Sequence, residues 1–265
     1  MKVVPGQTPA RRRSDLATRA FAGGAMIVVA VLALWLGGSA FWLLATLAAV
    51  LMLAEWAGLM RCSTPRITLA LVLFAVPLLF LLPAIAGPDR DTVALLVAAA
   101  LFTMVVGNSA RLGAGLLYAG LPAAGLMFLR EQPLGLALTL WTLAIVWATD
   151  IGAYFSGRAI GGPKLAPRLS PNKTWAGLLG GMAGALVVGA VIGWIGGLPS
   201  TYLWLGPIMA VLAQAGDLFE SWLKRRAKVK DSGRLLPGHG GALDRLDGVV
   251  PVAVLIAGLV AGGIL

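Results

Sequence analysis

The sequence predicts an all-α, polytopic integral membrane protein with about nine transmembrane helices. Of its 265 residues, 59% are apolar and only 12% are charged, whereas a typical soluble domain contains about 25% charged residues. Apolar runs of about 20 residues recur along the chain, which is the length that crosses a hydrocarbon core of about 30 Å as a helix. Helices are expected because a backbone in lipid must satisfy its own hydrogen bonds.

The apolar runs give nine candidate spans, and no soluble domain is visible between them. These spans are residues 20–37, 39–60, 67–87, 92–107, 111–129, 134–150, 174–197, 200–220 and 249–265. The first six belong to an N-terminal region, residues 1–150, and the last three to a C-terminal region, residues 151–265, with long polar loops at 151–173 and 221–248. The fourth and last spans are short, so eight and ten crossings are the alternatives.

The lysines and arginines set the expected orientation, because these residues are enriched in cytoplasmic loops. If the N-terminus is cytoplasmic, all of the 21 basic residues except Arg90 and Arg130 fall in cytoplasmic segments. One miscounted span in the middle of the chain would destroy this asymmetry. We therefore expect the N-terminus and both long polar loops to face the cytoplasm.

The net charge of +10 and the single cysteine limit the classes of partner and site. A basic protein can bind nucleic acid, an anionic membrane surface or a phosphorylated substrate. Here the basic residues lie in the expected cytoplasmic segments, and we expect no nucleic-acid partner. Cys62 excludes an internal disulfide and a CxxC-type metal site. The arginines before the first span imitate a signal peptide without a convincing cleavage site, so this helix is expected to be retained.

The seventh span contains glycine pairs spaced four residues apart, such as Gly177 with Gly181 and Gly189 with Gly193. This spacing lets the backbone of another helix approach closely. Packing within one bundle is the preferred interpretation, and the interface of a homodimer is the alternative.

Three polar residues at the end of the sixth span have helical spacing. Asp150, Tyr154 and Arg158 are four residues apart, so they share one face if the helix continues beyond the membrane boundary. The loop that follows ends in Lys173, and either Asn172 or Thr174 is expected to cap the seventh helix. The helix N-terminus and Lys173 could together bind an anion, although a basic cytoplasmic loop with an ordinary cap explains the same residues.

The end of the eighth span carries a stripe of polar residues. Asp217, Glu220, Ser221 and Lys224 stand at positions i, i+3, i+4 and i+7 of a helix and so lie on one face. Because carboxylates at membrane depth are costly, this stripe favours a solvated or metal-bound cavity. The alternative is a pair of structural ion pairs at a helix end.

The segment before the last span adds further candidates for a site. His239 lies among glycines that allow the backbone to approach a ligand, but zinc is not expected because the chain has no second histidine. Asp244 and Asp247 are about one turn apart and are expected to open the last helix. Their hard oxygen ligands suit Mg²⁺ bound to phosphate oxygens.

These segments together resemble the phosphatidate cytidylyltransferase (CDP-diacylglycerol synthase) family. The long C-terminal motif of that family is matched by Ser221-x-x-Lys224-Arg225-x4-Lys230-Asp231-x-Gly233-x-x-Leu236-Pro237-x-His239-Gly240-Gly241-Ala242-x-Asp244-Arg245-Leu246-Asp247. A second block is matched by Asp150-x-x-Ala153-Tyr154-x-x-Gly157-Arg158 and Ser170-Pro171-x-Lys173-Thr174. The chain departs from the family pattern at Ala176, where glutamate is usual, and at Ala242, where a larger aliphatic residue is usual.

The resemblance implies a nucleotidyltransferase that converts CTP and phosphatidic acid into CDP-diacylglycerol and pyrophosphate during phospholipid biosynthesis. It makes residues 151–265 the catalytic region, with an active-site cavity on the cytoplasmic side of a bacterial-type inner membrane. The implied catalytic residues are Asp217, Asp244, Lys224 and His239. The implied ligands of Mg²⁺, with K⁺ as an optional second cation, are Asp217, Asp244, Asp247 and Asp150. The implied substrate-binding residues are Ser221, Arg225, Lys230, Asp231, Arg245, Lys173, Arg158 and Tyr154.

Two other classes of protein are weighed against this interpretation. One is a membrane nucleotidyl- or phosphoryltransferase that acts on another lipid; the CDP-alcohol phosphotransferases fit poorly, because their Asp-Gly-x-x-Ala-Arg motif is absent at Asp247. The other is a transporter or channel, which predicts polar residues at span centres. Only Glu55 is embedded in this way, and for Glu55 a structural hydrogen bond is preferred to a functional role.

Overall fold

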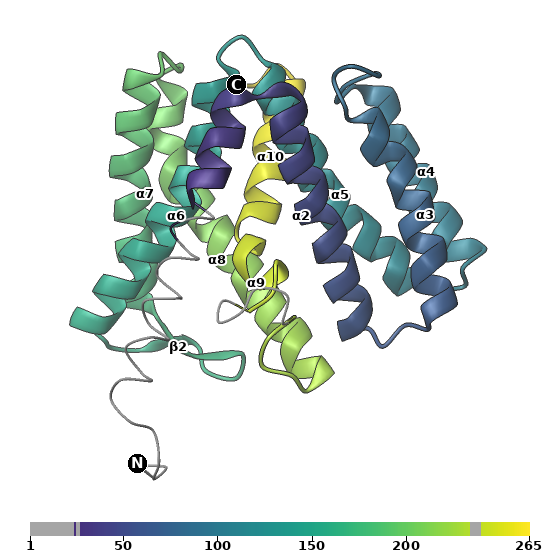
Figure 1. Cartoon of the computed structure of the whole chain (residues 1–265). Coiled ribbons are helices and arrows are strands. Elements are labelled where there is room, and N and C mark those ends of the chain that lie inside the picture. Colours follow the sequence, from purple (N-terminus) through teal and green to yellow (C-terminus); the bar gives the residue numbers. More distant parts are fainter. Residues whose placement is uncertain (1–23, 25–26, 234–239) are drawn as a thin grey trace, which may run out of the picture.

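The computed structural model describes residue 24, residues 27–233 and residues 240–265. A helix over Ile27–Leu36 precedes the labelled elements (Figure 1). The helices are α2 (Gly38–Leu59), α3 (Thr64–Phe80), α4 (Arg90–Val105), α5 (Ala110–Glu131), α6 (Gly135–Ala159), α7 (Trp175–Ile195), α8 (Thr201–Ala227), α9 (Leu243–Leu246) and α10 (Val249–Ala261). Two short strands, β1 (Lys164–Ala166) and β2 (Ser170–Thr174), form an antiparallel pair.

The helices bear out the prediction of an α-helical membrane protein. In the described part of the chain, five helices are long and apolar enough to cross a membrane, namely α2, α5, α6, α7 and α8. The helix over Ile27–Leu36, α3 and α10 are apolar but shorter. Each of the nine predicted spans contains a helix, whereas the number of membrane crossings stays a prediction.

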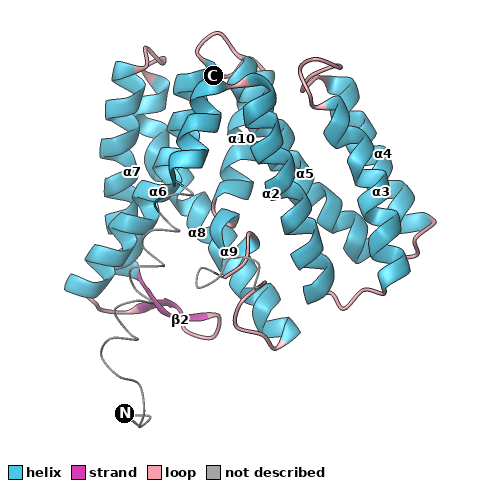
Figure 2. Ribbon diagram, in the orientation of Figure 1, coloured by secondary structure: helices cyan, strands magenta, loops and turns pink. Residues whose placement is uncertain are grey.

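Two details of the predicted secondary structure were wrong, and one was confirmed. The β1–β2 hairpin lies in a loop predicted without strands (Figure 2). A helix that continues beyond the predicted sixth span, as the shared face of Asp150, Tyr154 and Arg158 required, is confirmed, because α6 ends at Ala159. Asp244 lies in the separate short helix α9, and Asp247 follows it, so neither residue is in the last long helix.

The glycines of α7 pack against α6 within the same chain. A Cβ at Gly184 would lie 2.8 Å from the carbonyl oxygen of Ala148, and one at Gly181 would lie 2.9 Å from that of Thr149. The indole Nε1 of Trp141 in α6 donates to the carbonyl oxygen of Gly189 over 2.9 Å. The glycine stripe therefore serves packing inside the bundle, while a homodimer stays a prediction.

The polar elements gather at one end of the bundle. In Figure 1 the β1–β2 hairpin, α9 and the C-terminal end of α8 lie at the lower end, and the C-terminus lies at the upper end. The C-terminal end of α2 is near α8 as well, since Arg61 donates to the carbonyl oxygen of Ala227 over 3.4 Å. The fold thus brings segments from both halves of the chain to one boundary of the apolar bundle.

Candidate active site

The first part of the site comes from α6, β2 and α8. Arg158 donates to the Tyr154 hydroxyl over 3.3 Å, so the end of α6 presents these residues on one exposed face, as the spacing predicted. Lys173 reaches from β2 to α8, where its Nζ lies 2.5 Å from a carboxylate oxygen of Asp217 and 2.8 Å from the amide oxygen of Gln214. The hairpin that was not predicted from the sequence therefore positions one of the predicted basic residues.

The cap of α7 fixes the chain immediately after Lys173. The Thr174 hydroxyl accepts a hydrogen bond from the backbone N–H of Gly177 over 3.0 Å, which satisfies one of the free donors at the start of the helix. Thr174, rather than Asn172, is therefore the N-cap. Because the cap is buried, the chain passes from β2 into α7 in a defined direction. This direction points Lys173 toward α8.

The second part of the site is an ammonium group shared by two carboxylates. The Nζ of Lys224 lies 2.5 Å from an oxygen of Glu220, one turn earlier in α8, and 2.7 Å from an oxygen of Asp244 in α9. The side chain of Glu220 is 1% exposed, and its Oε1 has no hydrogen-bond partner among the described residues. The sequence predicts Glu220 as part of the polar stripe but not as a site residue, because spacing alone does not show which carboxylate is buried.

Asp244 accepts several hydrogen bonds from the chain on either side of the gap in the described residues. Its Oδ2 accepts from the backbone N–H groups of Ser232 over 3.0 Å and Gly241 over 2.8 Å. Burial by itself would raise the pKa of Asp244, but its hydrogen bonds with Glu220, Lys224 and the two backbone groups hold that pKa well below its usual range. Asp244 is therefore a carboxylate held in place by several hydrogen-bond donors. Its partner Ser232 was not predicted from the sequence.

A second acidic group consists of Asp150, Asp217 and Asp247. Burial raises the pKa of Asp247 to about 7, with further contributions from the negative charges of Asp217 and Asp150. The backbone N–H of Gly248 donates to Asp247 over 2.7 Å and opposes this rise in pKa. Asp150 lies in α6, Asp217 lies in α8 and Asp247 follows α9. These three carboxylates are thus close enough for their negative charges to repel one another.

The two acidic groups differ in how well they suit a metal ion. Among the described residues, no three His, Cys, Asp or Glu side chains form a ready set of ligands. Nevertheless, the repulsion that raises the pKa of Asp247 is the kind that a divalent cation relieves, and hard carboxylate oxygens suit Mg²⁺. Asp244 fits less well, because Lys224, Ser232 and Gly241 already donate to it.

The remaining predicted residues surround these groups. Ser221 lies 3.4 Å from Asp217 and can donate to it, and Arg225 donates to the carbonyl oxygen of Leu169 over 3.3 Å. The exposed residues of this region include Lys230, Asp231 and Arg245. His239 lies outside the described residues.

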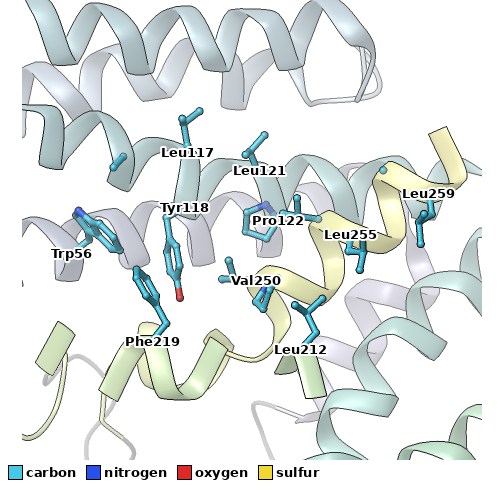
Figure 3. A pocket seen from close by; sticks show the side chains of 14 residues that line it. Trp56, Leu117, Tyr118, Leu121, Pro122, Leu212, Phe219, Val250, Leu255 and Leu259 are labelled. Atoms are coloured by element: carbon cyan, nitrogen blue, oxygen red, sulfur yellow. The ribbon is translucent and has the colours of Figure 1, made fainter. Parts of the chain in front are cut away.

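An apolar groove of about 740 Å³ lies beside the charged groups. Figure 3 shows Trp56, Tyr118 and Phe219 gathered at one end of the groove and Leu255 and Leu259 farther along α10. The Tyr118 hydroxyl is buried without a hydrogen-bond partner among the described residues. The groove passes between α2, α5, α8 and α10. Helices α2 and α8 also contribute polar residues to the charged end of the bundle, which is the end that carries Lys224, Glu220 and Asp244.

A bundle of apolar helices with clustered ammonium and carboxylate groups at one end defines the class of membrane proteins that carry a polar site at the boundary of the bundle. The chain belongs to the Cytidylyltransferase family, whose pattern matches residues 17–261. It is 41% identical over 254 residues to a phosphatidate cytidylyltransferase of Brucella suis, and the match covers 92% of each chain. Proteins of that name from Pseudomonas aeruginosa and Bacillus subtilis are 43% and 47% identical over 58% and 43% of each chain.

The raised pKa of Asp247 predicts a pH-dependent effect on stability. In detergent-solubilised protein treated with EDTA, Asp247→Asn should raise the midpoint of thermal unfolding at pH 8 and leave it nearly unchanged at pH 4. The unfolded carboxyl loses its proton near pH 4 and the folded carboxyl near pH 7, so the folded state loses stability as the pH rises between these values.

The matched control for this experiment is Asp89→Asn. Asp89 is an exposed N-cap whose pKa is lowered by the hydrogen bond from the backbone N–H of Thr92, so its replacement should bring no gain in stability at pH 8. An unfolding midpoint for Asp247→Asn that falls at pH 8 would contradict the repulsion among the three carboxylates.

Proposed function

We propose that this protein transfers the cytidylyl group of CTP to phosphatidic acid and releases pyrophosphate, which yields CDP-diacylglycerol. The observation that carries this proposal is the gathering of Lys173, Lys224 and their carboxylate partners at one end of an apolar bundle. Such a site can meet a water-soluble nucleotide and a lipid whose chains stay in the bilayer. Family membership and the names of the relatives support the same reaction.

The reaction requires two anionic phosphates to approach each other. An oxygen of the lipid phosphate attacks the α-phosphorus of CTP, a new P–O–P bond forms, and the bond to pyrophosphate breaks. A phosphate monoester has a second pKa of about 6 and is already largely a dianion at neutral pH, so no general base is needed. The residues of the chain therefore act mainly by binding, orienting and neutralising charge.

The basic residues have distinct environments for this task. Lys173 and Lys224 are fixed by carboxylates and are proposed to contact the reacting phosphates. Arg158, Arg225 and Arg245 are exposed around them and are proposed to bind the outer phosphates. Tyr154, Ser221, Lys230, Asp231 and His239 complete the proposed substrate-binding set.

We further propose that Asp150, Asp217 and Asp247 hold Mg²⁺, with K⁺ as an optional second cation. The support is the electrostatic repulsion among these three carboxylates. Bound Mg²⁺ would neutralise phosphate charge and polarise the reacting phosphate. Asp244 stays a candidate ligand, although its hydrogen bonds suit a second task, which is to hold Lys224 in place.

An assay of label transfer tests the function directly. Purified protein in detergent with phosphatidic acid, Mg²⁺ and CTP labelled at the α-phosphate should move the label into the lipid phase. Asp217→Asn and Asp244→Asn should each lower kcat at least about a hundredfold, as expected for removal of strong electrostatic contributions. Asp89→Asn, which changes an exposed carboxylate at α4, is the matched control and should stay within about twofold of the native rate.

The outcomes of this assay separate the rival classes of protein. Absence of label in the lipid with folded native protein would refute the proposed reaction, and ion permeation in liposomes would then favour a transporter. Transfer of label to a polyprenyl phosphate in preference to phosphatidic acid would favour the other lipid transferases. Near-native activity of an aspartate variant would refute the role proposed for that residue.

We propose that the apolar groove receives an acyl chain of phosphatidic acid. Its lining is apolar and extends along α10 away from the charged end (Figure 3), which matches the polarity of a lipid with one phosphate. This arrangement would let the head group meet CTP while the chain stays in an apolar environment.

The variant Gly258→Leu tests the groove without changing the charged groups. Gly258 lines the groove, and a Cβ there would meet no atom within 4 Å, so a leucine side chain can start there and occupy part of the groove. We expect kcat/KM to fall about tenfold for dioleoyl phosphatidic acid and to stay within about twofold for the dihexanoyl form, since filling an apolar pocket changes binding by about 1–3 kcal/mol.

A comparison of two glycines separates a blocked groove from a disturbed helix. Gly58→Leu introduces the same side chain at another open helical glycine, which lies outside the groove. It should affect both lipids equally. An equal loss of activity on the long and short lipids in Gly258→Leu would contradict the proposed acyl-chain site.

We propose that nine helices cross the membrane and that the charged end faces the cytoplasm. The distribution of basic residues supports this orientation. An odd number of crossings also agrees with the position of the C-terminus at the end of the bundle opposite the charged site (Figure 1).

The single cysteine reports the orientation. Cys62 lies in the loop between α2 and α3, so a membrane-impermeant maleimide should label it in inverted vesicles and not in right-side-out vesicles. Ser63→Cys, at the exposed neighbouring position, controls for the partial burial of Cys62. Labelling in right-side-out vesicles would reverse the proposed orientation.

A further inference from the structure

Glu55 is a buried carboxylate in the N-terminal half of the chain, and the proposed reaction does not use it. It lies in α2, and the residue is 5% exposed. An unpaired carboxylate at such a position is costly. The contacts that compensate for this cost come from a segment about 180 residues later in the chain.

Both oxygens of Glu55 accept hydrogen bonds from the segment that carries Asp244. Oε1 accepts from the backbone N–H of Ala242 over 2.9 Å, and Oε2 accepts from the backbone N–H of Leu243 over 2.9 Å. The Ser232 hydroxyl lies 2.9 Å from Oε2 as well. One side chain of α2 therefore binds the chain before and after the undescribed residues 234–239.

The same serine connects Glu55 to the charged site. The Ser232 hydroxyl is 3.0 Å from Oδ2 of Asp244 and can donate to either carboxylate, while its backbone N–H donates to Asp244. Asp244 in turn lies 2.7 Å from the ammonium group of Lys224. A continuous chain of hydrogen bonds thus runs from Glu55 through Ser232 and Asp244 to Lys224.

Two glycines leave room for the Glu55 carboxylate. A Cβ at Gly233 would collide with Glu55, and the three atoms nearest to it all belong to that side chain. A Cβ at Gly241 would collide with both Glu55 and Ser232. The backbone therefore passes so close to the carboxylate that neither position has space for a side chain.

The residue next to Glu55 also holds α2 in place. The indole Nε1 of Trp56 donates to the carbonyl oxygen of Arg111 over 2.8 Å, and its ring lies 5.0 Å from that of Tyr118. Glu55 therefore projects from a helix end that is fixed against α5. A rigid support of this kind is what a residue needs to hold a catalytic group in a productive geometry.

We propose that Glu55 is a positioning residue for the transferase: it fixes α9 and the adjoining segments so that Asp244 and Lys224 face the reacting phosphates. This proposal rests on the proposed function for its effect on catalysis. Glu55 does not contact the substrates. Its loss releases two backbone N–H groups and the Ser232 hydroxyl, and the ion pair of Lys224 with Asp244 then loses its fixed position.

Variants of Glu55 separate positioning from stability. Glu55→Ala and Glu55→Gln should each lower kcat per folded molecule at least about tenfold, which corresponds to about 1.4 kcal/mol of lost transition-state stabilisation. The glutamine side chain has nearly the same shape as that of Glu55, so Glu55→Gln provides the test if Glu55→Ala does not fold. Trp42→Phe is the matched control, because it removes a hydrogen bond from α2 to the carbonyl oxygen of Leu78, away from the site, and should keep kcat within about twofold.

A double-mutant cycle with Gly233 tests the close contact itself. Gly233→Ala should lower kcat in the native background, because the new methyl group displaces the Glu55 carboxylate. In the Glu55→Ala background the methyl group has space, so Gly233→Ala should cause little further loss. Equal losses in both backgrounds, or a native kcat in either Glu55 variant, would overturn the proposal.

Amide hydrogen exchange tests the same contact independently of the reaction. The peptide that contains Ala242 and Leu243 should exchange faster in Glu55→Ala than in native protein, while Trp42→Phe leaves its rate unchanged. If native protein has no cytidylyltransferase activity, the proposed function fails, and faster exchange still supports the contact. Unchanged exchange in Glu55→Ala, with native protein active, overturns the role of Glu55 alone.

Discussion

The charged end of this protein depends on the ammonium group of Lys224, which lies between the carboxylates of Glu220 and Asp244. Removal of one member of a buried ion pair typically costs about 3–5 kcal/mol, and loss of the Lys224 ammonium group would leave both acidic side chains without their shared partner. Because Lys224 and Glu220 belong to α8 and Asp244 to α9, the interaction also fixes these two elements relative to each other. The other polar contacts of the site are arranged around this triad.

The surrounding apolar bundle gives these charges their position at a boundary. The α6–α7 pair packs through glycines, while Trp56, Tyr118 and Phe219 join α2, α5 and α8 through ring contacts. These contacts leave an apolar groove beside the charged residues. Members of a family that joins a soluble nucleotide to a lipid need both environments in one site, and here the same helices provide them.

Much of this arrangement was predictable from local sequence properties. Apolar length located a helix in each of the nine segments, and helical spacing placed Asp150, Tyr154 and Arg158 on one face. The sequence limited the cap of α7 to Asn172 or Thr174, and the hydrogen bond from Gly177 selects Thr174. The β1–β2 hairpin and the separate helix α9 could not be predicted in this way, because both are short and depend on contacts with α8 and α2.

The sequence by itself determined the membrane-spanning character, the helical segments and the polar motifs, because hydrophobic length and residue spacing are properties of neighbouring residues. Only the tertiary structure decided which charges meet. The sequence assigned Glu55 a structural hydrogen bond but not its partners, and it did not separate Glu220 from Asp217. Their partners are set by packing between helices, and for Glu55 these partners lie up to 188 residues away; no local pattern encodes such a contact.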